Sequence, residues 1–187
     1  MTTRIEKDFY FSAALHFEGQ FYVNSYDLTL SMLVETDSIH EQNVAMGRIT
    51  YLLENFIQNS IFINSIHKKE IANYKKAGIK VCALPEEPFD QIVAMILMLK
   101  LNAIAEDRLK ITDMVVNSSM SQGVRFSIVS EIAEDLLSGN YWWNSSCFAV
   151  NNDSDSVGDF NKIIKLFRND EWLTVGLGWK ENGQNIN

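Results

Sequence analysis

Apolar and polar residues alternate along residues 8–35 of the chain. Phe9, Phe11 and Leu15 fall on alternate positions before a Glu-Gly-Gln break at residues 18–20, and Leu28 and Leu30 do so after it. Alternation with aromatic enrichment is typical of half-buried strands, and the break is short enough for a hairpin turn. The pattern therefore predicts a long antiparallel hairpin whose single apolar face must be covered.

Two long helices are predicted after this hairpin. Ser38 and Glu41 have the spacing of a capping box, and the apolar residues up to Ile57 follow a 3.6-residue period over about residues 39–58. The stripe of this helix is the natural cover for the hairpin. Pro88 suits the first position of a second helix, residues 89–105, which is apolar nearly all round. We expect it to be sandwiched between the sheet and a neighbouring helix or a partner subunit.

The shorter elements are read from weaker signals. Residues 60–66 are apolar without a period, so no element is predicted there. Residues 67–78 indicate a short basic helix with a solvated lysine face, and 80–84 a short strand. A second hairpin is predicted from strands at 109–117 and 124–129, followed by a helix over 130–139.

This order predicts an α+β protein. Its antiparallel sheet is built from two β-hairpins and carries two long helices on one face. Residues 1–138 form this core, and residues 139–187 form an aromatic-rich C-terminal extension that packs on it. Within the extension we expect a helix at 160–167 and a strand at 172–179.

Charge and cysteine content narrow the classes of partner. The net charge of −8 and the pI near 4.9 disfavour nucleic acid and anionic membrane surfaces. Cys82 and Cys147 match no disulfide framework or metal spacing, and no signal peptide is evident, so we expect a cytoplasmic protein. The most apolar run, residues 92–104, contains Lys100 and is too short to span a bilayer.

The order of strands and helices, together with Phe-Tyr-Phe-Ser-Ala-Ala at residues 9–14, resembles the tunnelling fold of the 6-pyruvoyl- and 6-carboxy-tetrahydropterin synthase family. In that family a Phe-x-Phe-Ser-Ala-Ala-His strand pairs with a His-Gly-His-Asn-Tyr strand, and the three histidines hold a catalytic zinc. Here the first histidine comes one residue late, at His16, which turns it to the opposite face of a regular strand. Tyr22 and Asn24 replace the other two histidines.

The resemblance covers roughly residues 8–130, and it implies a tunnelling-fold-like core that has lost the zinc chemistry. It places Asp113 where the family has a substrate-anchoring glutamate. The three histidines of the chain, His16, His40 and His67, do not pair at ligand spacing, so we expect no metal and no cofactor, with His40 and His67 as solvated surface residues.

Three functions remain open. The favoured one is a homo-oligomer, structural or ligand-binding and not catalytic, whose subunits join sheet edges into a ring. The alternative is a zinc-independent enzyme or binder of a pterin- or purine-like molecule at subunit interfaces. Its candidate ligand-binding residues are Asp113, Glu131, His16, Tyr22 and Asn24. A third possibility is a partner-binding adaptor that uses the aromatic tail.

Overall fold

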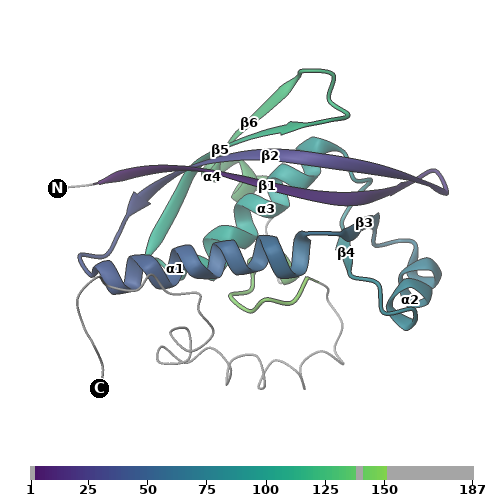
Figure 1. Cartoon of the computed structure of the whole chain (residues 1–187), viewed down its shortest axis with the longest axis horizontal. Helices are drawn as coiled ribbons and strands as arrows, with labels where there is room; N and C mark the ends of the chain where they lie inside the picture. The colour runs from purple at the N-terminus through teal and green to yellow at the C-terminus, as the bar shows by residue number, and fades with distance from the viewer. Residues whose placement is uncertain (1–2, 138–140, 151–187) are drawn as a thin grey trace, which may run out of the picture.

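The strands of this protein form one mixed sheet. The computed structural model describes residues 3–137 and 141–150, and its strands lie in the order β4-β3-β1-β2-β5-β6 (Figure 1). The elements are β1 (Arg4–Phe17), β2 (Gln20–Val34), α1 (Ile39–Leu52), the π-helix η1 (Leu53–Ile57), β3 (Ser60–Asn64), α2 (Lys68–Lys76), β4 (Val81–Leu84), α3 (Asp90–Ala105), β5 (Leu109–Ser118), β6 (Arg125–Val129), α4 (Ser130–Leu136) and the 3₁₀-helix η2 (Trp142–Asn144). The predicted α+β class is confirmed.

The predicted hairpin is confirmed as β1 and β2, which pair continuously from Arg4 opposite Leu33 to Phe17 opposite Gln20. Glu18 and Gly19 both have positive φ, 50° and 75°. Two such residues give the turn whose twist matches that of the flanking strands. The alternating apolar residues of both strands are buried together: Phe9, Phe11, Ala13, Leu15, Tyr26, Leu28, Leu30 and Met32.

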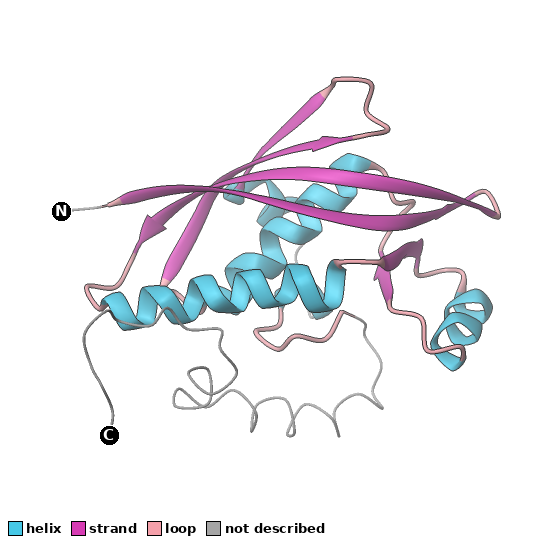
Figure 2. Cartoon of the chain, in the orientation of Figure 1, coloured by secondary structure: helices cyan, strands magenta, loops and turns pink. Residues whose placement is uncertain are grey.

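The helices α1 and α3 cover this apolar face, side by side on one side of the sheet (Figure 2). The Ser38 side chain accepts a hydrogen bond from the Glu41 N–H at 3.3 Å and so caps α1. The Glu41 carboxylate pairs with Arg108, so its predicted return bond in the capping box is replaced by an ion pair. The long helix predicted to residue 58 ends as η1, in which Leu53 and Ile57 remain buried.

The expectation of a purely antiparallel sheet is wrong, because β3 lies parallel to β1 and β4 lies parallel to β3. Every residue of β3 is buried, so the strand has no solvent-exposed side and its sequence lacks the alternation of a half-buried strand. The core covers one face of β3, and α2 covers the other through Ile71 and Tyr74. The remaining neighbours, β1-β2-β5-β6, are all antiparallel.

The described part of the C-terminal extension, residues 141–150, contacts α3 through η2 and adds four buried apolar side chains to the core: Trp142, Trp143, Phe148 and Val150. This segment explains why α3 is apolar nearly all round, as expected of a sandwiched helix. The predicted helix at 160–167 and strand at 172–179 lie outside the described residues.

The ammonium group of Lys100, a residue of α3, binds this segment through hydrogen bonds. The Lys100 side chain is 0% exposed, and its Nζ donates hydrogen bonds to the carbonyl oxygens of Trp142, Ser145 and Cys147 at 2.7, 2.8 and 2.5 Å. The ammonium group also lies 5.5 Å from the centre of the Trp142 ring. An ammonium has three donors, and all three are satisfied here, which makes its burial tolerable.

Among the described residues, no helix combines the length and apolar character needed to cross a membrane.

Replacing Lys100 with methionine leaves three carbonyl oxygens without their donor. We expect Lys100→Met to lose about 2–4 kcal/mol of unfolding free energy, because an unpaired buried carbonyl costs about 1–3 kcal/mol. Urea unfolding followed by tryptophan fluorescence measures the loss. Lys76→Met, on the exposed side of α2, is the control and should change stability by less than about 0.5 kcal/mol. Equal losses in the two variants would contradict the role of Lys100.

The stability conferred by Lys100 should also depend on pH. Burial lowers the pKa of its ammonium from 10.5 to about 8. Between these values the unfolded chain binds more protons, so unfolding free energy rises with pH by up to about 1.4 kcal/mol per unit. The stability of the wild type relative to Lys100→Met should therefore grow from pH 8 to pH 10. A difference that stays constant or shrinks over this range would show that the three carbonyl oxygens keep the ammonium charged.

Candidate functional site

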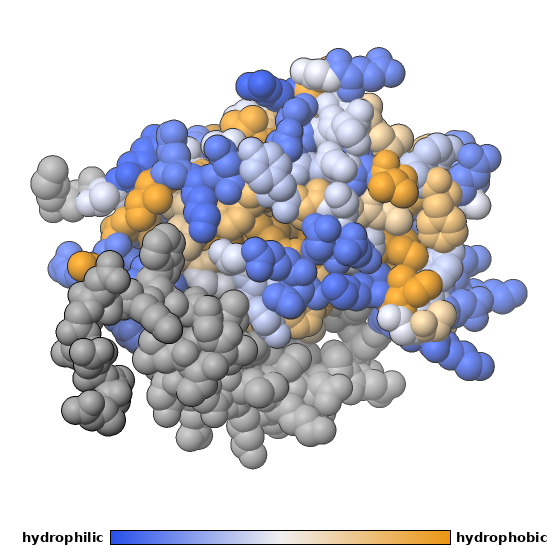
Figure 3. Space-filling model, viewed as in Figure 1, coloured by the Kyte–Doolittle hydropathy of each residue, from blue (hydrophilic) through white to orange (hydrophobic). Residues whose placement is uncertain are grey.

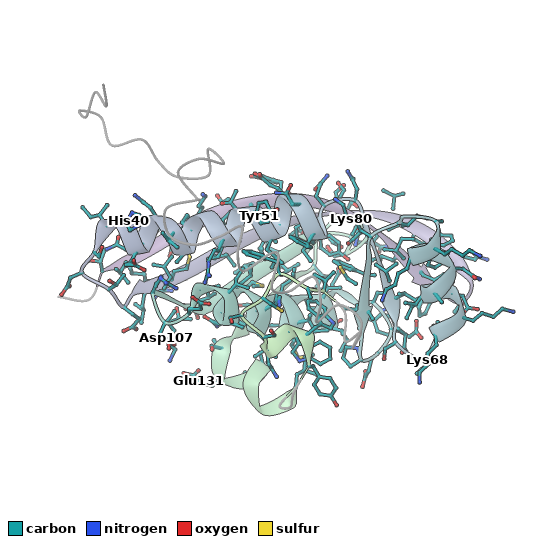
Figure 4. The ribbon with its side chains drawn as sticks, turned by 90° about the horizontal axis from the view of Figure 1, so that it is seen from below. His40, Tyr51, Lys68, Lys80, Asp107 and Glu131 are labelled. Carbon is teal, nitrogen blue, oxygen red and sulfur yellow. The ribbon has the colours of Figure 1, made fainter. Side chains whose placement is uncertain are left out.

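The five candidate ligand residues lie in separate parts of the chain. Tyr22 and Asn24 point to the helix-covered face of β2, whereas His16 points to the opposite face of β1. Asp113 lies on the open face of β5, opposite Ser31 of β2. Glu131 is exposed on α4 and is seen at the lower edge of Figure 4. Within one subunit the structure brings only Tyr22 and Asn24 onto the same part of the fold.

The displaced histidine of the first motif behaves as the one-residue shift predicts. The β1–β2 register continues without a bulge through Leu15 opposite Tyr22 and His16 opposite Phe21. Leu15 therefore enters the core beside Tyr22, and His16 faces α2.

Asn24 is the centre of a buried polar network. Its side chain is 0% exposed, and its Oδ1 accepts hydrogen bonds from Ser119 Oγ at 2.8 Å and from the Met120 N–H at 3.2 Å. Its Nδ2 donates to Asp90 Oδ1 at 3.5 Å, and Ser118 Oγ donates to Asp90 Oδ2 at 2.7 Å. Asp90 is the first residue of α3, where the helix dipole favours a carboxylate. The network thus ties β2, the β5–β6 loop and the start of α3 together.

The same network changes the acidity of Tyr26. Burial, and then the negative charge of Asp90, raise the pKa of this phenol. Its hydroxyl lies near Asn24 and Asp90 but makes no hydrogen bond of acceptable geometry. A phenol that stays protonated in the core does not serve as a base near neutral pH. The arrangement is suited to fixing the backbone rather than to proton transfer with a substrate.

A second polar cluster lies at the tip of the hairpin, on the other face of the sheet. The His16 side chain is 5% exposed, and the centre of its ring is 5.3 Å from that of His67, at the N-cap of α2. His67 Nε2 lies 3.8 Å from Glu87 Oε1, which also accepts a hydrogen bond from Asn64 Nδ2 at 3.0 Å. Within residues 3–137 and 141–150, no group forms a hydrogen bond with the buried His16 Nδ1 or Glu87 Oε2.

This cluster corrects the expectation for His67. The sequence predicts a solvated surface residue, but the structure buries part of its side chain, leaving 33% exposed. The cause is β3, which was not predicted and which carries the start of α2 to the tip of β1. Glu87 lies in the loop between β4 and α3. No pattern in the sequence connects it with His16, because they are brought together by pairing between distant strands.

Metal binding and nucleophilic chemistry find little support in these residues. Over residues 3–137 and 141–150, no group of three His, Cys, Asp or Glu side chains is arranged to hold a metal ion. Asp113 Oδ2 is engaged by Arg4 at 3.0 Å and by Thr112 Oγ1 at 2.7 Å. Burial raises the pKa of the Cys82 thiol to about 12, so it is not a nucleophile at neutral pH.

No protein-family model matches the chain, and no curated protein is significantly similar to it.

Among the candidate ligand residues, His16 and Asn24 are buried, and they should respond differently to replacement by leucine. Asn24→Leu removes three part-buried hydrogen bonds, each of which contributes about 0.5–1.5 kcal/mol, so we expect a loss of about 2–4 kcal/mol of unfolding free energy. His16→Leu removes an unpartnered polar atom among aromatic rings and should be neutral or stabilising by about 1 kcal/mol. Denaturant unfolding of both variants tests this. A large loss in His16→Leu would show that Nδ1 has a partner in solution.

Proposed function

We propose that the protein is a homo-oligomer with a tunnelling-fold-like core, in a structural or ligand-binding role without catalysis. The proposal is supported by the antiparallel series β1-β2-β5-β6, whose apolar face is covered by α1 and α3. The unit β3-α2-β4 is then an insertion beside β1. The proposal rests on the edges of the sheet, where backbone N–H and carbonyl groups lack backbone partners within the described residues.

The edge of β1 is open over residues 4–11. Ser12 marks the limit: its N–H donates to Gln58 Oε1 at 3.0 Å, and its carbonyl oxygen accepts from the Asn59 N–H at 2.8 Å. Outward backbone groups recur at every second residue of an antiparallel pair, so those of Glu6, Asp8 and Tyr10 point along the same edge. None of these has a backbone partner on that side within the described residues.

Elsewhere, amide side chains of the chain itself form hydrogen bonds with the outward backbone groups of edge strands. Where β6 stops short of β5, the Ile111 N–H donates to Asn102 Oδ1 at 2.7 Å, and Asn102 Nδ2 donates to the Ile111 carbonyl at 3.1 Å. In a similar way, Gln58 Oε1 accepts a hydrogen bond from the outward N–H of Ser12. Within the described residues the β1 edge has no such closure over about 26 Å of strand, and β6, the last strand at the other end of the sheet, pairs with β5 alone. Two open edges on opposite sides of a sheet allow head-to-tail pairing of subunits.

Light scattering at micromolar concentration should return a multiple of the 21.4 kDa chain mass. Asp8→Pro removes an outward N–H without removing a bond to β2, so we expect it to shift the protein towards monomers. Asp8→Asn keeps the N–H and is the matched control. Slow hydrogen exchange at the Glu6, Asp8 and Tyr10 amides of the wild type provides a second measurement that needs no variant. A wild-type monomer with rapid exchange at these amides would refute the proposal.

A further inference from the structure

The open face of the sheet carries a row of four side chains set by strand register. Tyr10 of β1 is opposite Asp27 of β2, Asp27 is opposite Asn117 of β5, and Asn117 is opposite Arg125 of β6. Adjacent strands are about 4.8 Å apart, and β5 lies between β2 and β6, so the backbones at Asp27 and Arg125 are separated by about 10 Å. Hydrophilic side chains are numerous along the upper edge of the molecule, where β5 and β6 lie (Figure 3).

A hollow of about 190 Å³ lies over this row. It is lined by Asp8, Tyr10, Asp27, Leu28, Thr29, Val115, Asn117 and Arg125. Most of these residues belong to the row itself and to the next row along the strands, Asp8-Thr29-Val115. The space equals that of about six water molecules, which is enough for a ligand the size of an amino acid.

The charges in the hollow are not neutralised by the described chain. Asp8 Oδ1 accepts a hydrogen bond from Thr29 Oγ1 at 2.6 Å, and Asp27 Oδ2 accepts one from Asn117 Nδ2 at 3.5 Å. Neither carboxylate forms an ion pair with any residue of 3–137 or 141–150, and neither does Arg125. Asp113, on the same face but outside the hollow, is paired with Arg4 at 3.0 Å.

The arrangement separates the two signs of charge. Asp8 and Asp27 are diagonal neighbours on adjacent strands, so both acidic residues lie at one end of the row, and Arg125 lies at the other. Paired carboxylates favour a cationic nitrogen group, whereas a guanidinium favours a carboxylate held by two hydrogen bonds. The Tyr10 side chain is 73% exposed at the acidic end, where its ring is placed to contact a cation.

We propose that this hollow is a binding site for a small zwitterion of the basic amino acid class. The cationic side chain of the ligand lies between Asp8 and Asp27, its carboxylate pairs with Arg125, and Asn117 supplies a hydrogen-bonding group between them. The site does not depend on the proposed oligomer, because all of its residues come from one subunit.

The test is a titration of the ¹⁵N-labelled full chain with L-arginine at low salt, to about 20 mM, a range that covers millimolar affinity. We expect amide shift changes confined to the strand segments that line the hollow. Agmatine lacks the carboxylate and L-citrulline lacks the side-chain charge, so each should bind at least about fivefold more weakly. Affinity should fall because the charges are screened when salt is raised.

Two variants and one matched control localise the site. Asp27→Asn and Arg125→Gln should each weaken L-arginine binding at least about fivefold. Asp113→Asn removes a carboxylate from the same face outside the hollow and should leave binding unchanged. The proposal is overturned if shifts are absent or lie elsewhere, if Asp113→Asn weakens binding equally, or if agmatine binds as tightly as L-arginine. A monomer that still binds L-arginine would refute the proposed assembly and leave this site standing.

Discussion

The structure depends on burial of one face of the β1–β2 hairpin. Each fully buried Leu, Phe or Met contributes about 1.5–3 kcal/mol, and both strands place such residues on the same side. A pair of strands this long is not stable by itself, because a two-stranded ribbon leaves its apolar face in water. The helices α1 and α3 remove that face from solvent, and the order of layers follows from this requirement.

Because α3 is apolar nearly all round, covering the hairpin buries only one of its sides, and the other sides must be buried as well. This helix contacts the sheet with one side and α1 and α4 with others, and it is still apolar on the side where residues 141–150 lie. Lys100 interrupts that apolar surface, and the carbonyl oxygens of the extension surround its ammonium. The aromatic segment and the buried cation therefore require each other. Removing either would leave polar groups without partners in the core.

The two faces of the sheet have different chemical roles. On the helix-covered face, polar side chains such as Asn24 and Asp90 fix loops and helix starts, and Asn24 is fully buried. On the open face, charged side chains such as Asp27 and Arg125 lie in one row across the strands, with Asn117 between them, and they lack ion-pair partners in the described chain. The residues expected from the sequence to share a ligand are divided between these faces, which separates Asn24 from Asp113.

The sequence by itself determined the elements that are buried on one side. The alternation in β1 and β2, the 3.6-residue period of α1 and the opposite-face position of His16 were all readable, because one-sided burial leaves a period in the chain. The tertiary structure decided what no local period records. Burial of β3 on both faces erased its alternation, so the parallel strands and the approach of His67 to His16 were not predicted. The row from Tyr10 to Arg125 depends on register between strands far apart in sequence, and that register is set by packing of the whole sheet.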